Sequence, residues 1–335
     1  MSGFLGADRA VELAGRASAR ASALAATPGA RRWWRALLGN PAAAAGTTLL
    51  VAFGVVALAA PWIAPCPAGQ ERHCGDDPYR VPRYGFAGMP RPPSAEHPFG
   101  TTGKQYDVFY GLVWGTRTAF RVGLLITIPA LLVGVAVGAT AGYFGGWADE
   151  ILMRTVEVFM AFPFFVAAVT LASALRAHPQ LGQGLLAPML ALLAFGWMGY
   201  ARLLRASVLS VKERDYVWAA RALGVGDGRI ILRHVIPNSM FSVLVAASLD
   251  VGGTVLAFAG LSFFGLGVPD GYADWGQMLA AAHDRLPSLG RDWHLVVFPA
   301  LALVLFALGC TLVGDGIRDA LDPQSASRLP ASERR

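Results

Sequence analysis

The sequence predicts an all-α integral membrane protein with six transmembrane helices. Of the 335 residues, 55% are hydrophobic and only 15% are charged, whereas soluble domains carry about 25% charged residues. The mean hydropathy is +0.47. Several apolar segments also approach the roughly 20 residues that a helix needs to cross the hydrocarbon layer of a bilayer. They are too numerous for the core of a soluble protein.

Six apolar segments are expected to form the spans. The first, 42–63, is a continuous stretch rich in Ala, Val and Leu. The segment 66–116 is rich in Pro, Gly and charge, so it is expected outside the membrane, with one short amphipathic helix over 106–116. The other five spans are expected at 123–143, 151–175, 185–204, 241–263 and 294–313. Pro163 interrupts the third span and is expected to kink it.

The chain is expected to divide into four parts. Residues 1–40 carry scattered Arg without a compact apolar region and a cleavage site, which indicates a cytoplasmic arm and no signal peptide. Residues 41–116 hold the first span and an outer loop. Residues 117–323 hold a core of five helices, including a long polar insertion at 205–239. Residues 324–335 form a tail.

The distribution of Lys and Arg predicts the orientation in the membrane. The N-terminal arm and the segment 202–233 are strongly basic, whereas the loop before the last span leans acidic, with Asp270, Asp274, Asp284 and Asp292. Both basic segments are therefore expected in the cytoplasm. With six spans, both termini then lie inside and the loop 66–116 lies outside, so every second loop falls on the expected side.

The composition excludes several other functions. The formal net charge of +6 does not indicate nucleic-acid binding, because the basic residues lie between and outside the apolar spans and do not alternate with aromatic residues on a polar surface. No Gly-x-x-x-x-Gly-Lys-Ser/Thr loop is present to bind the phosphates of ATP. No Gly-x-Ser-x-Gly motif and no nucleophile with a plausible base occur either. No catalytic residue is therefore expected.

The segment 215–238, DYVWAARALGVGDGRIILRHVIPN, is expected to form a helix, a turn and a second helix at the cytoplasmic surface. Gly224 and Gly226 break the first helix, and Asp227 can cap the second, which runs to Pro237. A short helix that is small and apolar on one face and basic on the other suits insertion into a groove of a partner protein. Composition alone equally allows a solvated surface helix.

The spacing of residues in this segment resembles the coupling loop of binding-protein-dependent ABC permeases. The signature of that family is Glu-Ala-Ala, three residues, Gly, nine residues and then Ile-x-Leu-Pro. Ala219, Ala220, Gly224 and Pro237 fall at the required spacings, whereas Trp218 stands where the family usually has Glu. The resemblance extends over about residues 40–323 and is closest to the permeases of the dipeptide, oligopeptide and nickel importers.

Four further motifs carry the resemblance. They are HPFGT at 97–101, GYFGGWADE at 142–150, LSFFGLG at 261–267 and GDGIRDALDP at 314–323. They lie before the second span, at the first cytoplasmic turn, after the fifth span and at the end of the sixth. Together they are highly specific for this family.

The resemblance implies the permease fold of type I ABC importers, in a bacterial inner membrane. It also implies a homologous second permease subunit, two cytoplasmic ATPase subunits that bind ATP and Mg, and an extracytoplasmic solute-binding protein. This chain would bind no cofactor itself. The residues expected to couple it to an ATPase subunit are Trp218, Ala219, Ala220, Arg221, Leu223, Gly224, Asp227 and Pro237.

The expected substrate is a peptide. Nickel or another small solute is the alternative, disfavoured because no cluster of His or Cys lies in the spans. A secondary transporter or channel would suit the composition equally well. Such folds tend to show internal repeats with broken helices, and no such symmetry is visible in this sequence.

Two carboxylates inside the expected spans, Glu157 and Asp250, are candidates for the translocation path. A charged side chain at the centre of a membrane helix costs about 3 kcal/mol on insertion scales. Each carboxylate could face the path and contact the amino end of a peptide or another cation. Each could equally bond to a neighbouring helix or to water, and both interpretations stay open.

Cys66 and Cys74 are eight residues apart in the outer loop, which would face an oxidising compartment, and a disulfide between them is expected. A metal site is the alternative, because His73 precedes Cys74. A closed site needs four ligands, however, and only these three residues are near enough in sequence. No metal is therefore expected. Cys310, deep in the sixth span, is expected to be a packing residue.

Overall fold

The computed structural model describes residues 40–321 except 87, 179–180, 182–183 and 284. Within this part of the chain the regular elements are helices, and β structure is limited to isolated bridges. The predicted tail 324–335 and the predicted N-terminal arm, apart from Asn40, lie outside the described residues.

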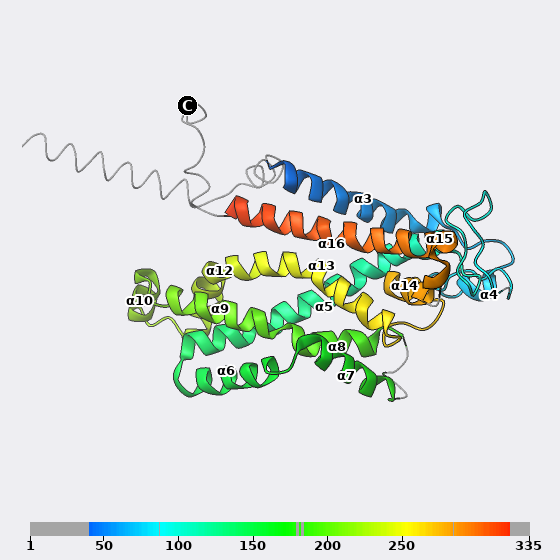
Figure 1. Ribbon diagram of the computed structural model, residues 1–335. Helices are drawn as coiled ribbons and strands as arrows, with labels where there is room; N and C mark the ends of the chain where they lie inside the picture. The colour runs from blue at the N-terminus through cyan, green and yellow to red at the C-terminus, as the bar shows by residue number, and fades with distance from the viewer. Residues whose placement is uncertain (1–39, 87, 179–180, 182–183, 284, 322–335) are drawn as a thin grey trace, which may run out of the picture.

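The long helices lie side by side in a bundle (Figure 1). The elements in chain order are α3 (Pro41–Ile63), α4 (Glu71–Cys74), α5 (Val108–Phe144), α6 (Gly146–Met160), α7 (Phe164–Arg176), α8 (Leu186–Gly196), α9 (Met198–Val211), α10 (Asp215–Ala222), α11 (Asp227–Ile230), the π-helix η1 (Ile231–Val235), α12 (Ile236–Ser239), α13 (Phe241–Phe263), α14 (Trp275–His283), the 3-10 helix η2 (Leu286–Ser288), α15 (Leu289–Asp292) and α16 (His294–Leu321). Among the described residues, five helical segments are long and apolar enough to cross a membrane, with Leu186–Val211 counted as one. The pair α6 and α7 gives a sixth if the bent pair is a single span. The all-α membrane fold is therefore confirmed.

Helix α5 is longer than the sequence predicts. A separate helix over 106–116 and a span over 123–143 are expected, but Val108–Phe144 form one continuous helix of 37 residues. Asp107 caps its start by accepting a hydrogen bond from the Tyr110 amide at 2.8 Å. The polar residues between the two expected pieces do not end the helix, and the Arg117 guanidinium lies over the ring of Trp114 at 5.1 Å. The predicted division of the chain at 116 consequently falls inside α5.

The third and fourth spans also differ from their predicted bounds. Instead of a kinked span over 151–175, α6 and α7 are two helices that meet at an angle of 85°. Pro163 lies at the break, directly before the first residue of α7, where its missing N–H removes no helical hydrogen bond. The fourth span continues past its predicted end at 204 to Val211, because Leu204 and Val208 are fully buried.

Helix α5 is the centre of the bundle. It packs against α9 and α13, while α13 packs against α16, and α16 against α3. Its contact with α9 depends on Gly134, Gly138 and Gly142, because a Cβ on Gly138 would overlap the carbonyl oxygen of Ala201. Small residues spaced four apart let two membrane helices approach closely. The three glycines of α5 therefore allow its close contact with α9.

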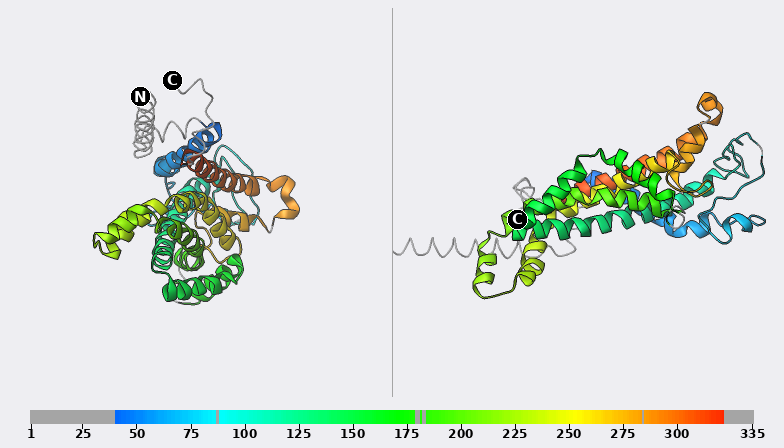
Figure 2. Two further views of the ribbon diagram at one scale, coloured as in Figure 1. Left: turned by 90° about the vertical axis from the view of Figure 1, so that its left-hand side faces the viewer. Right: turned by 90° about the horizontal axis from the view of Figure 1, so that it is seen from below.

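The outer loop and the segment 205–239 lie at opposite ends of the bundle. Figure 1 places α4, α14 and α15 at one end, and α10 and α12 at the other, together with the start of α3 and the end of α16. The two views of Figure 2 show α10 projecting beyond the bundle. The predicted separation of the two segments is confirmed, and their assignment to particular sides of the membrane stays a prediction.

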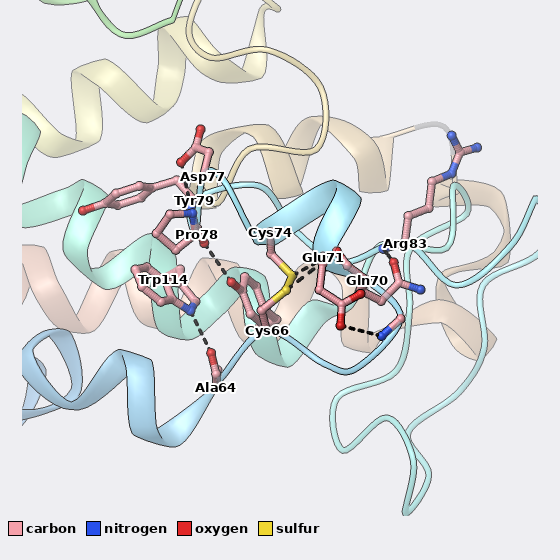
Figure 3. The surroundings of a disulfide bond; sticks show 12 residues. Ala64, Cys66, Gln70, Glu71, Cys74, Asp77, Pro78, Tyr79, Arg83 and Trp114 are labelled. Carbon is pink, nitrogen blue, oxygen red and sulfur yellow. Dashed lines mark hydrogen bonds between the residues drawn. A yellow bond between two sulfur atoms is a disulfide. The ribbon is translucent and has the colours of Figure 1, made fainter.

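A disulfide closes the start of the outer loop, and hydrogen bonds tie this region to α5. Cys66 and Cys74 are joined, with their Cα atoms 5.6 Å apart (Figure 3). Next to them, the Trp114 indole N–H donates to the Ala64 carbonyl oxygen at 2.9 Å, and the Tyr110 hydroxyl donates to the Pro78 carbonyl oxygen at 2.9 Å. Within the described residues, no group of three or more His, Cys, Asp or Glu could hold a metal ion.

The outer loop also pairs with the segment before α14. The amide of Val81 donates to the Gly271 carbonyl oxygen at 2.8 Å, and the Lys104 ammonium pairs with Asp270 at 2.7 Å. Asp274 lies between this segment and α14 and is 6% exposed. Burial raises the pKa of its carboxyl to about 6, although the amide of Gln277 donates to it at 2.9 Å. Contacts within the chain therefore hold the outer loop against the segment before α14.

Candidate functional site

Helix α10 ends in a turn that requires glycine. Gly224 has a φ of 75°, a left-handed conformation that glycine adopts without the penalty of a Cβ. The amide of Gly224 donates to the Arg221 carbonyl oxygen at 2.9 Å, and the amide of Val225 donates to that of Ala220 at 3.1 Å. These two bonds form a Schellman motif. The turn predicted at Gly224 is therefore present, whereas Gly226 has an ordinary φ of −64°.

One face of α10 is anchored in the bundle. Val217 is fully buried and Ala220 is 8% exposed. Both belong to an apolar cluster with residues of α5, α9, α11 and η1, namely Tyr143, Leu204, Val208, Ile230 and Val235. Ala220, which the sequence places at the contact with a partner, therefore packs against its own subunit. The small side chain serves close packing of α10 on the bundle.

Other residues of α10, and residues after it, expose large apolar side chains. Trp218 is 53% exposed and Leu223 is 83% exposed. Ala219 is also exposed. Leu232 on η1 is 71% exposed and Tyr216 is 43% exposed, and neither is among the contact residues predicted from the sequence. Their position as large apolar residues within a polar, basic segment could have identified them from the sequence. Large apolar side chains exposed on a projecting segment are candidates for contact with a partner protein.

Polar contacts connect residues 215–239, here called the α10–α12 hairpin, to the end of α5. The Tyr143 hydroxyl donates to Asp227 at 2.6 Å. The Arg221 guanidinium lies over the rings of Tyr143 at 5.0 Å and Trp218 at 5.3 Å. The hairpin therefore contacts α5 through Tyr143. The motif at 142–150 contains this residue, but its contact with the hairpin was not predicted.

Two predictions for the second helix of the hairpin need correction. Asp227 does not cap it, because Gly226 is the N-cap residue and makes no side-chain bond, while the Asp227 carboxylate is engaged by Tyr143. Pro237 does not end it. The π-helix η1 runs directly into α12 at Ile236, and Pro237 is the second residue of α12.

The motif at 142–150 joins α6 to α9. The Arg205 guanidinium on α9 donates through Nε and Nη2 to both carboxylate oxygens of Asp149, the latter at 2.6 Å. Two parallel bonds between a guanidinium and a carboxylate fix orientation as well as distance. Lys212, the residue that follows α9, donates to the carbonyl oxygen of Gly142 on α5 at 2.9 Å.

Glu157 lies on the exposed side of α6. It lines a hollow of ≈ 430 Å³ with Met153, Arg202 and Arg205. Its carboxylate pairs at 3.3 Å with Arg154, and the two side chains are 62% and 72% exposed. An ion pair at such exposure contributes about 1 kcal/mol or less. The carboxylate therefore has a cationic partner on its own helix, a contact that neither of the two interpretations included.

Asp250 lies near the middle of α13 and lines a different cavity, of ≈ 340 Å³. The other lining residues come from α5, α7, α8, α9 and α13 and are Ile126, Thr127, Ala130, Phe164, Leu192, Phe195, Gly196, Tyr200, Gly253, Thr254 and Ala257. The side chain of Tyr200 interacts with Asp250, and the hydroxyls of Thr127 and Thr254 are 3.3 Å apart. The structure does not bring Glu157 and Asp250 into one cavity.

Comparisons with known proteins place the chain in a family. A family model described as "Binding-protein-dependent transport system inner membrane component" matches residues 134–326. One described as "N-terminal TM domain of oligopeptide transport permease C" matches residues 28–73. The dipeptide transport system permease protein DppC of Bacillus subtilis (strain 168) is 35% identical over 292 residues, which are 87% of this chain and 84% of that protein.

Two further matches agree. The glutathione transport system permease protein GsiD of Pectobacterium atrosepticum is 32% identical over 297 residues, 89% of this chain and 92% of that protein. Among solved structures, a chain of the MetNI methionine ABC transporter in an inward-facing conformation has a TM-score of 0.51 at 18% identity, over 64% of this chain and 97% of that chain. At this identity the likeness concerns the fold.

Fold and matches together define a membrane permease of the ABC importer class. More particularly, the chain belongs to the family of binding-protein-dependent transport system inner membrane components. The resemblance that the sequence carries is confirmed.

Proposed function

We propose that this chain is the non-catalytic permease subunit of an ATP-driven peptide importer. It lies in a bacterial inner membrane with both termini in the cytoplasm. It pairs with a homologous second permease, and the two subunits enclose the translocation path. Two ATPase subunits bind ATP and Mg, and an extracytoplasmic solute-binding protein delivers the peptide to the outer end.

The choice of a peptide is supported by the names of the relatives. They are described as permease proteins of dipeptide, oligopeptide and glutathione transport systems. Nickel is less well supported, because a nickel site would draw on several His or Cys ligands, and no such group occurs in the described part of the chain.

The observation that carries the proposal is the exposed apolar side of α10. Trp218 and Leu223 are largely exposed on a hairpin that projects past the end of the bundle (Figure 2). A short helix that presents apolar anchors suits a groove on a partner protein. We assign that groove to an ATPase subunit, because the hairpin lies at the end predicted to be cytoplasmic.

The contacts of the hairpin explain how its movement would reach the bundle. When nucleotide closes the ATPase subunits, α10 moves with the groove that holds it. Val217 and Ala220 are packed against the bundle, and Asp227 is bonded to Tyr143 on α5, so α5 follows. Nucleotide thus biases two alternatives, an outward-open and an inward-open path.

The test is purification and reconstitution of the complex. The tagged full-length chain is extracted in mild detergent, and the co-eluting subunits are identified by mass spectrometry. The complex is then placed in proteoliposomes, and uptake of a radiolabelled dipeptide is measured with ATP, with a non-hydrolysable ATP analogue and with or without the binding protein.

We expect two ATPase subunits and a second permease to co-elute, and uptake to require hydrolysable ATP. Uptake by the chain in the absence of any ATPase subunit would instead indicate a secondary transporter. Uptake of nickel with no uptake of dipeptide would replace the substrate and leave the importer class intact.

A further inference from the structure

The cavity at Asp250 has one charged group and polar hydroxyls on otherwise apolar walls. Among the described residues that line it, Asp250 carries the only formal charge. Tyr200 and Thr254 contribute hydroxyl groups, and Phe164, Phe195 and Leu192 contribute apolar surface. Small-molecule sites combine a few convergent polar groups with apolar walls in this way, and their volumes start at about 300 Å³.

The charge of Asp250 has no cationic partner in the described part of the chain. The ion pairs found there involve other carboxylates, those of Asp77, Asp107, Asp149, Glu157 and Asp270. The neighbour that does interact with Asp250 is the neutral side chain of Tyr200. An unpaired carboxylate halfway along a membrane helix is costly, so its position favours an ion that visits the cavity.

The chemistry of the cavity selects among cations. A divalent metal needs several anionic or imidazole ligands, and the cavity offers one carboxylate. A primary ammonium group needs less, since one carboxylate and neighbouring hydroxyl oxygens can accept its three N–H bonds. The apolar walls can take up a hydrocarbon side chain next to that ammonium group.

We propose that the Asp250 cavity is a binding site for the protonated amino group of a peptide in transit. Asp250 is its binding residue, with the hydroxyls of Tyr200 and Thr254 as secondary acceptors. The site favours solutes with a free amino end and disfavours anions. It rests on the proposed function for the identity of the solute, but its preference for cations is a property of this chain alone.

The test measures the electrostatic potential in the cavity with a cysteine. Gly253 lines the cavity, and a Cβ placed on it meets nothing within 4 Å, so Gly253→Cys introduces a thiol next to Asp250 without a clash. The native cysteines give little background, because Cys66 and Cys74 form a disulfide and Cys310 is 3% exposed. The variant is made in the full complex in native membranes.

The labelling rates of a cationic and an anionic methanethiosulfonate reagent are then compared in three backgrounds. We expect Asp250 to favour the cationic reagent, Asp250→Glu to keep that preference, and Asp250→Asn to lower the ratio of the two rates by about tenfold. An unchanged ratio in Asp250→Asn, or no labelling by either reagent, would overturn the proposal.

A second measurement keeps Asp250 intact, so it does not depend on how the Asn variant folds. The peptide alanyl-phenylalanine and its N-acetylated form are each added during labelling of Gly253→Cys. We expect only the free amine to slow the reaction, and equal protection by both peptides would contradict an amino-group site. If ATP-driven peptide uptake fails while the charge preference persists, the proposed function is wrong and the cation site stands.

Discussion

The two ends of the molecule differ in how far the chain completes its own contacts. At the outer end, a disulfide closes part of the loop 66–107 on itself, and the Lys104–Asp270 pair and backbone hydrogen bonds link the loop to the segment before α14. At the other end, the α10–α12 hairpin leaves Trp218, Leu223 and Leu232 more than half exposed. The outer end is cross-linked by its own contacts, although Phe86 and Met89 are exposed there. The hairpin presents apolar surface that no other part of the described chain covers.

The difference indicates a division of labour. Contacts that the chain makes with itself add rigidity, so the outer end is a fixed structure on which a binding protein could dock. Exposed apolar side chains add little to the fold until a partner covers them. Changes at the hairpin should therefore alter assembly and transport, while changes at the outer end should alter stability.

The largest effect is expected from Trp218→Asp combined with Leu223→Asp. Burial of each large apolar side chain contributes about 2 kcal/mol, so their joint loss should weaken binding of the ATPase subunits by about a thousandfold. Co-purification of the ATPase with the tagged permease measures it. The control is Phe86→Asp with Met89→Asp, which makes the same change at exposed residues of the outer end. Undiminished co-purification of the ATPase with the hairpin variant would contradict the role of Trp218 and Leu223 in binding it.

The next effect concerns pH and the outer end. The pKa of Asp274 is raised from 3.8 to about 6 by burial, so between these values the folded protein keeps a proton that the unfolded chain releases. The stabilising contribution of this group should therefore be fully present below pH 4 and fall as the pH rises towards 6, by at most about 3 kcal/mol. Asp274→Asn should remove this contribution and keep the bond from Gln277. Thermal unfolding of both proteins from pH 4 to 7 measures the difference, and parallel curves would refute it.

A smaller effect, of about 2 kcal/mol, is expected at the turn of the hairpin. Gly224→Val forces a β-branched residue into a left-handed conformation, so uptake should fall by about tenfold while the protein stays in the membrane. Gly226→Val is the matched control, because Gly226 has a negative φ and free space around it. Gly224→Asn should restore part of the uptake, since Asn tolerates this conformation. Equal uptake by Gly224→Val and Gly226→Val would contradict the role of the turn.

The smallest effect is expected from Cys66→Ser with Cys74→Ser. A disulfide that closes so short a loop contributes about 2 kcal/mol or less to local stability. Hydrogen exchange in residues 64–84 should rise, and uptake should stay near the wild-type level because Trp114 and Tyr110 still hold the loop. Loss of uptake would show that the outer end also takes part in transport.

Local sequence patterns predicted most of the fold. Apolar segments located the spans, and Gly224 located the turn, because both signals act within a few residues. Contacts distant in the chain were not predictable. Arg205 binds Asp149, 56 residues earlier in the chain, and Asp227 is engaged by Tyr143, 84 residues earlier. The spacing of Ala219 and Ala220 located the hairpin, but which of them faces the bundle depends on the packing of α5 and α9.

The length of α5 has a mechanical consequence. Its 37 residues include Pro129 and, at 1.5 Å each, span roughly 55 Å, nearly twice the thickness of the hydrocarbon layer. Tyr143 near one tip meets the hairpin, and Tyr110 near the other meets the outer loop. If the helix pivoted at its hairpin tip and kept its shape, a tilt of about 5° would swing the far tip by about 5 Å. A lever of this kind needs no chain of small adjustments to carry motion from one membrane surface to the other.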